Sequence, residues 1–435
     1  MFNSKKLLSL TLSLIFVSSM TYAGRSAHTD TVWRERVEAD TRLQIVLQKA
    51  ESLIKTGLNA GTVYAEVWIR DLNTFIEPAC KVGDRQKIRE SLLMFFRFQG
   101  EDGNIVDGYI PRKDEKEKYD FLYSKLAPEF AAHKNTVETD QESSLIQAIA
   151  KYIAATGDES ILKVEIGGRT VEKRMADAMQ FLLDKRFCDK YGLLWGATTV
   201  DWGDVQPEQD WGVRLDSSSH RCIDIYDNAM FAIALKDYIG MIDNEKEIEH
   251  WKKIRENIIS NSRKYLWDKV KQKFIPHIYL EGSPFPDDFN ENAIYYHGGT
   301  AVAIEAGMLS RDEILASYRQ MKQNVKDAGA QTIGLTVYPP YPNGFFKNPA
   351  MYAYGYQNGG DWTWFGARMV QQLLANGFYE EAYEALSPML DRVIKYDGFY
   401  EWWTPGGEPK GAAMFRGSAG VLWKAISMIT EIPNK

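Results

Sequence analysis

A carboxylate stands among aromatic residues near the end of the sequence. Residues 398–403 read GFYEWW, so that Glu401 lies between Tyr400 and Trp402, and a Pro-Gly-Gly turn follows at 405–407. Aromatic rings stack on the apolar C–H faces of a pyranose, while carboxylates and amides bind its hydroxyl groups. We therefore expect Glu401 to act on a bound sugar, with Tyr400 and Trp402 in contact with that sugar.

A second acidic and aromatic loop, residues 200–212, reads VDWGDVQPEQDWG. Hydrolysis of a glycosidic bond requires two carboxyl groups, one protonated to release the leaving oxygen and one ionised to activate water or to attack. Aromatic surroundings raise the pKa of a carboxyl group, because they disfavour its charged form. The partner of Glu401 is expected among the acids of this loop, which are Asp201, Asp204, Glu208 and Asp210.

Other reactive sites have little support in the sequence. No GxGxxG, P-loop, HExxH or GxSxG motif is present, and no His or Cys cluster has metal-ligand spacing. We expect no cofactor, although the acids between Asp201 and Asp210 are of the type that binds a structural Ca²⁺.

The elements that position these loops are helical. Helical periodicity runs along the whole chain, whereas alternating strand patterns are short and confined to loops. Gly57, Gly83 and Gly377 each end an apolar periodic run, as a left-handed helix C-cap does. The expected helices are 30–56, 69–82, 84–98, 139–156, 170–185, 224–243, 245–267, 298–308, 310–326, 360–376, 378–394 and 415–430.

The connections between these helices differ in a regular way. Short turns lead into the helices at 84–98, 245–267, 310–326 and 378–394, whereas long aromatic and acidic loops lead into alternate helices, beginning with 69–82. Such alternation is expected of a closed ring of six helical hairpins, in which the loops before the inner helices meet at one end. The sequence therefore predicts an all-α fold, an (α/α)6 toroid with long loops on one face, and one domain over residues 24–435.

Residues 1–23 have the features of a secretory signal peptide. Two lysines precede an apolar run at 7–17, and Thr21-Tyr22-Ala23 is a small-x-small cleavage pattern. We expect cleavage after Ala23 and export to the periplasm or the cell exterior. No later apolar run is long enough to span a bilayer, so we expect no membrane span in the mature chain.

The net charge bears on which macromolecules the protein binds, and the cysteine count limits its disulfides. Removing residues 1–23 takes away two lysines and no acids, which changes the formal net charge from −7 to −9. An acidic protein binds nucleic acid and other polyanions poorly, so we expect no nucleic-acid partner. Separately, we expect the protein to be a monomer. Cys80, Cys188 and Cys222 are widely spaced, so at most one disulfide forms, and three buried thiols are the favoured alternative.

Several motifs resemble those of the six-hairpin, (α/α)6-barrel glycosidases. They are VWIRDLNTF at 67–75, the acidic Trp-containing loop at 200–212, NGGDW at 358–362 and the Glu-aromatic stretch before the last helix. The resemblance spans nearly the whole mature chain and is to trehalases, family 63 α-glucosidases and the glucosidase domain of glycogen-debranching enzymes. It implies an inverting hydrolase that releases a terminal, α-linked sugar from an oligosaccharide, and the signal peptide implies that this hydrolase is exported.

The resemblance also implies roles for individual residues. By position, Glu401 is similar to the base that activates water and Asp204 to the general acid, with Asp201 as the alternative acid. The substrate-binding residues that it implies are Trp68, Arg70, Asp71, Trp202, Asn358, Trp362, Tyr400 and Trp402. The glycine-rich run that precedes the base in trehalases is missing here, which argues against trehalose as the substrate.

Two other functions use the same ring of helices. A polysaccharide lyase would need groups that neutralise a uronate, and an acid-lined site would repel such a substrate. A noncatalytic glycan-binding protein would use the same aromatic residues, with acids that only orient sugar hydroxyls. A substitution of Glu401 by Gln distinguishes this binding protein from a hydrolase, because only the hydrolase loses turnover.

Overall fold

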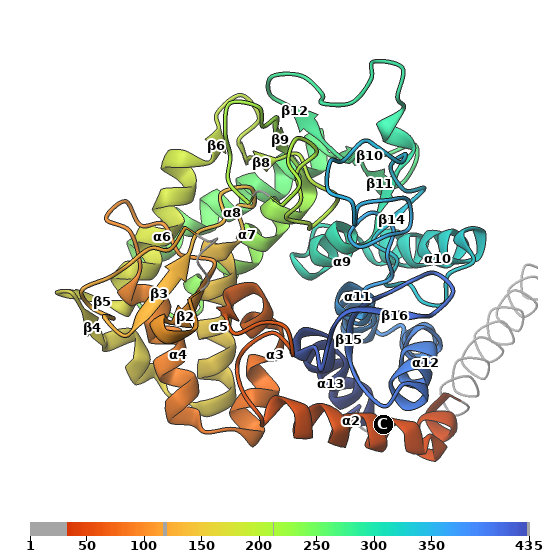
Figure 1. Ribbon diagram of the computed structural model, residues 1–435, viewed down its shortest axis with the longest axis horizontal. Coiled ribbons are helices and arrows are strands. Elements are labelled where there is room, and N and C mark those ends of the chain that lie inside the picture. Colours follow the sequence, from red (N-terminus) through yellow and green to blue (C-terminus); the bar gives the residue numbers. More distant parts are fainter. Residues whose placement is uncertain (1–32, 116–119, 212, 433–435) are drawn as a thin grey trace, which may run out of the picture.

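The computed structural model describes residues 33–115, 120–211 and 213–432. Its helices form an inner and an outer layer around one central axis (Figure 1). The inner helices are α3 (Ile69–Val82), α5 (Gln141–Thr156), α7 (Ile225–Ile239), α9 (His297–Glu305), α11 (Thr363–Ala375) and α13 (Arg416–Thr430). The outer helices are α2 (Thr41–Ile54), α4 (Arg85–Arg97), α6 (Val171–Lys185), α8 (Glu245–Tyr265), α10 (Arg311–Ala328) and α12 (Tyr379–Lys395).

The inner layer is a closed ring. Each inner helix packs against the next inner helix along the chain, and α13 packs against α3. Outer helices cover the ring, for example α8 on α7, α12 on α11 and α2 on α13. The predicted all-α (α/α)6 toroid is confirmed, and every predicted helix has a counterpart in it.

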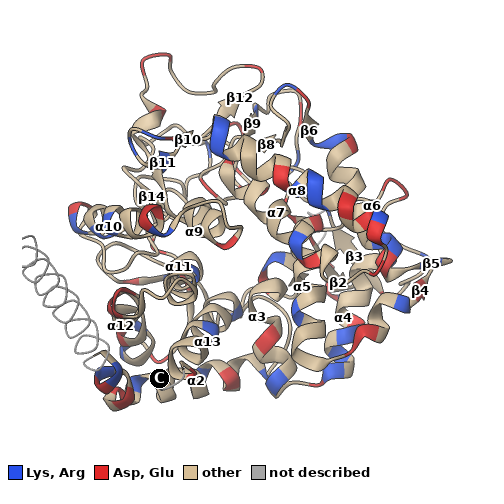
Figure 2. Cartoon of the chain, turned by 180° about the vertical axis from the view of Figure 1, so that it is seen from behind, with Lys and Arg blue, Asp and Glu red and all other residues tan. Residues whose placement is uncertain are grey.

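The two layers differ because their sequences bury different amounts of surface. All residues from Ile225 to Leu235 in α7 are buried, so this helix is enclosed on every side. In α8, by contrast, the buried residues are Trp251, Ile258 and Ser262, which lie along one stripe of an otherwise polar helix. Many Lys, Arg, Asp and Glu residues accordingly lie on outer helices such as α4 and α6 (Figure 2).

The first predicted helix is interrupted. Residues 33–39 are helical, and a new helix, α2, begins after Asp40. The Asp40 side chain accepts a hydrogen bond from the backbone N–H of Arg42, and its extended backbone ends the preceding helix. The N-cap preference of aspartate therefore prevails over continuous helical periodicity at this point.

Short antiparallel strands occupy the connections. Three-stranded sheets are formed by β1 (Val67–Trp68), β2 (Gly108–Pro111) and β3 (Phe130–His133), and by β8 (Gly196–Ala197), β9 (Arg221–Ile223) and β12 (Ile278–Tyr279). The two-stranded pairs are β4 (Glu165–Ile166) with β5 (Arg169–Thr170), β6 (Phe187–Cys188) with β7 (Leu193–Leu194), β10 (Trp267–Asp268) with β11 (Lys273–Phe274), β13 (Tyr295–Tyr296) with β14 (Val337–Tyr338), and β15 (Tyr400–Trp403) with β16 (Pro409–Ala413). Most of these strands lie in the connections that lead into the inner helices, whereas β4 and β5 lead into the outer helix α6.

Three further predictions concern the signal peptide, membrane spans and the cysteine thiols. The predicted signal peptide at 1–23 lies outside the described residues. Among the helices that the structure describes, none is long and apolar enough to cross a membrane. The three cysteines are free thiols, and Cys80 and Cys222 are buried as expected, whereas Cys188 is half-buried.

Candidate active site

Glu401 lies on β15, in the hairpin that precedes α13. Its side chain is buried, and two donors hold its carboxylate: Oε2 accepts from the backbone N–H of Ala412 over 2.7 Å, and Oε1 accepts from the Tyr64 hydroxyl over 3.0 Å. Gly411 has a φ of 70°, and a Cβ there would lie 2.4 Å from Glu401 Oε2, so glycine is needed for this close approach. Burial raises the pKa of Glu401, and the two hydrogen bonds oppose that rise.

Asp204 comes from the loop that precedes α7. It is half-buried, and its Oδ1 accepts a hydrogen bond from Gln357 Nε2 over 2.7 Å. The negative charge of Asp204 contributes to the raised pKa of Glu401, so the two carboxyl groups interact electrostatically. The structure therefore brings together the two acids that the sequence places in separate loops.

Asp201, the alternative acid, faces in another direction. Its two carboxylate oxygens accept hydrogen bonds from the backbone N–H groups of Gly298 (2.6 Å) and Gly299 (2.7 Å), at the start of α9. Asp201 is fully buried and has a positive φ of 57°, and burial raises its pKa to about 8. These contacts assign Asp201 to holding the N-terminus of α9, so Asp204 is the acid of this loop that remains near Glu401.

Arg70 and Asp71 open α3 beneath the loops. Arg70 forms ion pairs with Glu138 and with Asp140, whose Oδ2 lies 2.8 Å from Arg70 Nε, and the Tyr226 hydroxyl donates to the same oxygen over 2.7 Å. This network joins the N-terminal ends of α3, α5 and α7. Arg70, expected to bind the sugar, is thus occupied by two carboxylates.

Asp71 is the more exceptional of the two residues. Its side chain is buried, and among the described residues its Oδ1 has no hydrogen-bond partner. Burial raises the pKa of Asp71 to about 8, and the charges of Glu401 and Asp204 act in the same direction. A buried carboxyl group with an unused oxygen beside the two acids is well placed to bind a sugar hydroxyl.

Trp202 and Trp362 form a packed aromatic wall. Their ring centroids lie 4.6 Å apart in an edge-to-face arrangement, and Trp202 also stacks on Phe365 at 4.5 Å. Their relative exposures are only 1% and 2%, and Trp362 Nε1 donates to the carbonyl of Tyr356. Sugar stacking was expected of both rings, but other rings cover them, so they support the site from behind.

Asn358 was also expected to bind the sugar, and the structure assigns its side chain to the loop instead. Oδ1 accepts from the backbone N–H of Tyr341 over 2.8 Å, and Nδ2 donates to the carbonyls of Tyr341 and Met351, each over 3.0 Å. The side chain is fully buried. It fixes the long connection that leads into α11.

Three other aromatic residues were expected to contact the sugar, namely Trp68, Tyr400 and Trp402. Trp68, at the start of α3, is half-buried and packs against His133 with ring centroids 5.3 Å apart. Tyr400 is half-buried, whereas Trp402 is buried. Of the three, Trp68 and Tyr400 retain exposed ring surface for a sugar.

The sequence placed Tyr64 and Gln357 only in the general set of polar and aromatic loop residues that meet at one face, and it did not single out Asp107. Tyr64 contacts Glu401, Gln357 contacts Asp204, and Asp107 interacts electrostatically with Asp71 and Arg70. Burial raises the pKa of Asp107 to about 7. The only available signal was their position in the long loops, and that signal does not distinguish them from neighbouring polar residues.

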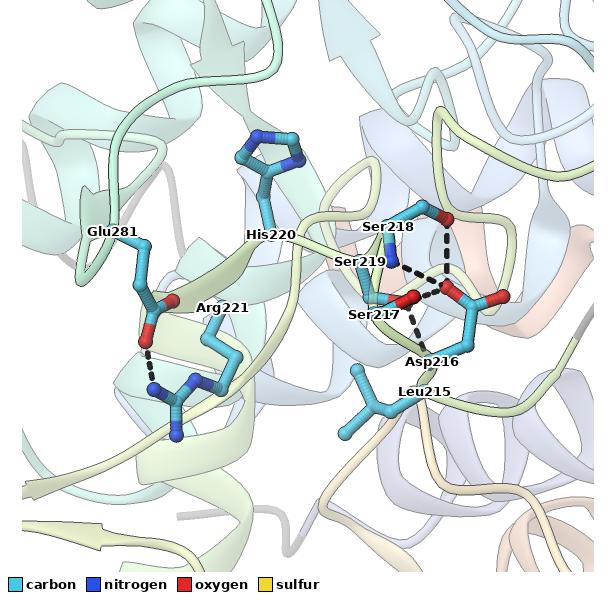
Figure 3. Close-up of a pocket in the computed structure, with 8 residues that line it drawn as sticks. All are labelled: Leu215, Asp216, Ser217, Ser218, Ser219, His220, Arg221 and Glu281. Carbon is cyan, nitrogen blue, oxygen red and sulfur yellow. Dashed lines mark hydrogen bonds and ion pairs between the residues drawn. The ribbon is translucent and has the colours of Figure 1, made fainter.

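A surface pocket farther along the loop before α7 is separate from this cluster (Figure 3). It is lined by residues 215–221 and Glu281. Asp216 accepts hydrogen bonds from Ser218 and Ser219 in its own turn, and Arg221 pairs with Glu281. Several polar groups of this pocket are thus already engaged with other residues.

The acids of residues 201–210 do not converge on a metal site. Glu208 pairs with His220 over 2.6 Å, Asp210 is exposed, and Asp201 and Asp204 have the separate partners described above. Across the described ranges, no group of three or more His, Cys, Asp or Glu residues is arranged to hold a metal ion.

Comparison with solved structures finds the same fold in two kinds of glycosidase. The chain is similar to the GH63 mannosylglycerate hydrolase of Thermus thermophilus in complex with glucose, with a TM-score of 0.62 and 15% identity, over 87% of this chain and 99% of that one. The same hydrolase in complex with Tris and D-glycerate gives a TM-score of 0.61 at 15% identity, with the same coverage. A rhamnosidase from Klebsiella oxytoca with rhamnose bound gives a TM-score of 0.54 at 13% identity, over 88% of this chain and 63% of that one. No protein-family model and no curated protein matches the sequence. The predicted resemblance to (α/α)6-barrel glycosidases is thus confirmed for the fold.

Proposed function

We propose that this protein is an exported glycoside hydrolase that inverts the anomeric centre and releases a terminal, α-linked sugar from an oligosaccharide. The observation that carries the proposal is the pairing of Glu401 and Asp204. They come from loops before two different inner helices, interact electrostatically, and are each held by a polar partner, Tyr64 and Gln357 respectively. Two carboxyl groups in different surroundings are the basic requirement of glycoside hydrolysis.

Glu401 is the general base in this proposal. The donors Tyr64 and Ala412 both favour the ionised carboxylate, which must be ionised to accept a proton from water. Burial raises the pKa of Glu401, so its carboxylate accepts a proton more readily than an exposed one does. Glu401 removes a proton from the water molecule that attacks the anomeric carbon.

Asp204 is the general acid, and its partial exposure suits that role. It protonates the glycosidic oxygen as the bond to the anomeric carbon breaks, so that the leaving sugar departs as a neutral alcohol. Trp68 and Tyr400 stack on the sugar, and Asp71 accepts a hydrogen bond from one of its hydroxyls. Arg70 supports this binding from below through Asp140 and Glu138.

The fold supports the proposal because the two named neighbours with the same ring of helices are a hydrolase and a rhamnosidase. The low identities leave the substrate open, so the α linkage and the terminal position rest on the motif resemblance. A glucose-releasing activity is the first to be tested, followed by the release of mannose and rhamnose.

The deciding experiment is sugar release from a panel of α- and β-linked gluco-, manno-, galacto- and rhamno-oligosaccharides. Asp204→Asn and Glu401→Gln are expected to lose at least about 100-fold in kcat. Asp210→Asn and Glu408→Gln are the matched controls, because both residues are exposed acids in the same two loops. If no substrate is cleaved and a glycan binds equally to all variants, the protein is a glycan-binding protein.

Stereochemistry and export have independent tests. Inversion predicts that the first product detected by NMR has the anomeric configuration opposite to that of the substrate. It also requires a separation of about 6.5–9.5 Å between the two carboxyl groups, whereas retention requires about 5–5.5 Å. Export predicts that the protein recovered from the periplasm or culture medium begins at Gly24.

A further inference from the structure

A buried glutamine contacts the proposed proton donor. Gln357 lies in the loop before α11, 153 positions from Asp204, and its Nε2 donates to Asp204 Oδ1 over 2.7 Å. The exposed fraction of Gln357 is 2%, whereas Asp204 is half-buried. The amide therefore approaches the carboxyl group from the protein side and leaves the exposed side to a ligand.

The backbone that carries this amide is anchored by its surroundings. The backbone carbonyl of Gln357 accepts a hydrogen bond from Thr336 Oγ1 over 2.8 Å. A Cβ at Gly203 would lie only 2.6 Å from Gln357 Oε1, so the glycine next to Asp204 makes room for the amide. Asn358, the next residue, is anchored by three hydrogen bonds to the backbone of Tyr341 and Met351. Among the described residues Gln357 Oε1 has no hydrogen-bond partner, so the bond from Nε2 to Asp204 is the contact that orients the amide.

We propose that Gln357 is a positioning residue that places the catalytic proton on Oδ2 of Asp204, an inference that rests on the proposed hydrolase function. An amide N–H can only donate, so the oxygen that it contacts is best used as an acceptor. The proton of the neutral carboxyl group then resides on the other oxygen. Gln357 thereby prevents the proton from occupying the oxygen that faces the protein interior.

The same contact acts throughout the reaction. Oδ2 transfers its proton to the glycosidic oxygen while the bond from that oxygen to the anomeric carbon breaks, and the leaving sugar takes the bonding electron pair. Glu401 accepts the proton lost by the attacking water, so the overall reaction consumes one water molecule. The carboxylate left on Asp204 retains the hydrogen bond from Gln357, which stabilises its new negative charge.

The test compares leaving groups that differ in their need for a proton. Gln357→Leu is assayed on α-linked glucose and mannose disaccharides and on α-glucosyl and α-mannosyl fluoride. A sugar leaves only with acid assistance, whereas fluoride leaves without protonation. We expect kcat on the disaccharide to fall about 10-fold or more, while kcat on the fluoride of the same sugar stays within about twofold. Equal losses on both substrates, or no loss on either, overturn the inference.

Two further variants separate positioning from folding. Gln371→Leu is the matched control, since Gln371 on α11 also donates its amide to another group, the carbonyl of Val421, away from both acids. It is expected to retain both activities. Gln357→Glu is expected to be impaired on the disaccharide at neutral pH and to recover relative to wild type as the pH falls, because only a protonated glutamate can donate to Asp204. A constant ratio to wild type across pH contradicts the proposal.

The outcomes distinguish this inference from the proposed function. If wild type cleaves neither disaccharide nor fluoride, or if Asp204→Asn leaves disaccharide cleavage intact, the function or its acid is misassigned. If Asp204→Asn abolishes disaccharide cleavage and Gln357→Leu behaves like wild type, only the role of Gln357 fails.

Discussion

The Tyr64 hydroxyl donates a hydrogen bond to Glu401 Oε1 over 3.0 Å, and this contact joins two loops that are 337 positions apart in the sequence. Together with the N–H of Ala412, it places a donor on each oxygen of a buried carboxylate. Both donors favour the ionised form, which is the form that a general base requires. The orientation of the proposed base therefore depends on the closure of the ring, which brings the first and last loops together.

Removing this hydroxyl is expected to impair turnover more than binding. For Tyr64→Phe we expect kcat to fall about 10-fold, since a hydrogen bond to a charged group contributes about 1.5–3 kcal/mol. Steady-state kinetics on the cleaved oligosaccharide measure this loss. Tyr318→Phe is the matched control, because Tyr318 also donates to a carboxylate, that of Glu384, but on the outer helices. Equal kinetics for the two variants would show that Tyr64 does not support the base.

The pH dependence of activity provides a second prediction. The proposed base must be ionised, and burial raises the pKa of Glu401 above the ordinary glutamate value of 4.5. We therefore expect kcat/KM to decline on the acid side with an apparent pKa higher than 4.5. Tyr64→Phe removes one donor to the carboxylate, so its acid limb should shift to still higher pH. An acid limb that shifts downward in Tyr64→Phe would contradict the assigned contact.

Asp71 is expected to contribute to function at the expense of stability. Its pKa is raised to about 8 in the folded chain from an ordinary value of 3.8, so the folded state binds more protons than the unfolded state between these values. The free energy of unfolding therefore decreases as the pH rises through this window. At pH 8, Asp71→Asn should be more stable than wild type by at least about 1 kcal/mol, with a smaller difference at pH 4, and its activity should fall.

Chemical denaturation at pH 4, 6 and 8 measures this prediction. Asp210→Asn is the control, because an exposed carboxylate at that position should give the same small difference at each pH. A stability difference for Asp71→Asn that does not grow with pH would show that Asp71 is ionised in the folded protein at neutral pH.

Asp201 and Asp204 should respond to substitution in opposite ways. Asp201→Ala leaves two buried N–H groups of α9 without their acceptor, and we expect a loss of about 2–4 kcal/mol in the free energy of unfolding. Asp204→Asn should retain the wild-type melting temperature and lose turnover. Thermal unfolding and activity measured on the same preparations test both expectations. A stable but inactive Asp201→Ala would return Asp201 to consideration as the general acid.

Asn358 is expected to act through the loop that it anchors. Asn358→Ala removes three hydrogen bonds to buried backbone groups, so the connection before α11 should open more often. We expect faster proteolytic cleavage between 341 and 358 and a lower kcat. Asn376→Ala, at the end of α11, is the control for loss of an amide-to-backbone contact elsewhere. A change in KM alone, without faster cleavage, would favour direct contact of Asn358 with the sugar.

The sequence by itself determined the helices and their arrangement. Apolar residues at helical spacing, glycines at helix ends and the alternation of turns with long loops are local features, and local features specify helices well. Even there, Asp40 shows a limit: its capping contact ends one helix and starts α2 inside a continuous periodic run. The ring also follows from the sequence, since short turns alternate with long loops between successive helices.

Only the tertiary structure decided how the polar residues of the loops are used. Asp201 and Asp204 lie three positions apart in the same acidic stretch, yet a left-handed backbone at Asp201 directs its carboxylate to α9. Asn358 and Gln357 are adjacent, yet one side chain holds the backbone and the other holds Asp204. Neither outcome is encoded in residue type or spacing, because loop backbones lack a fixed period and their side chains can find partners far along the chain, such as Gln357 for Asp204, 153 positions away, and Gly298 for Asp201, 97 positions away. Such partners become neighbours only when the ring of helices closes.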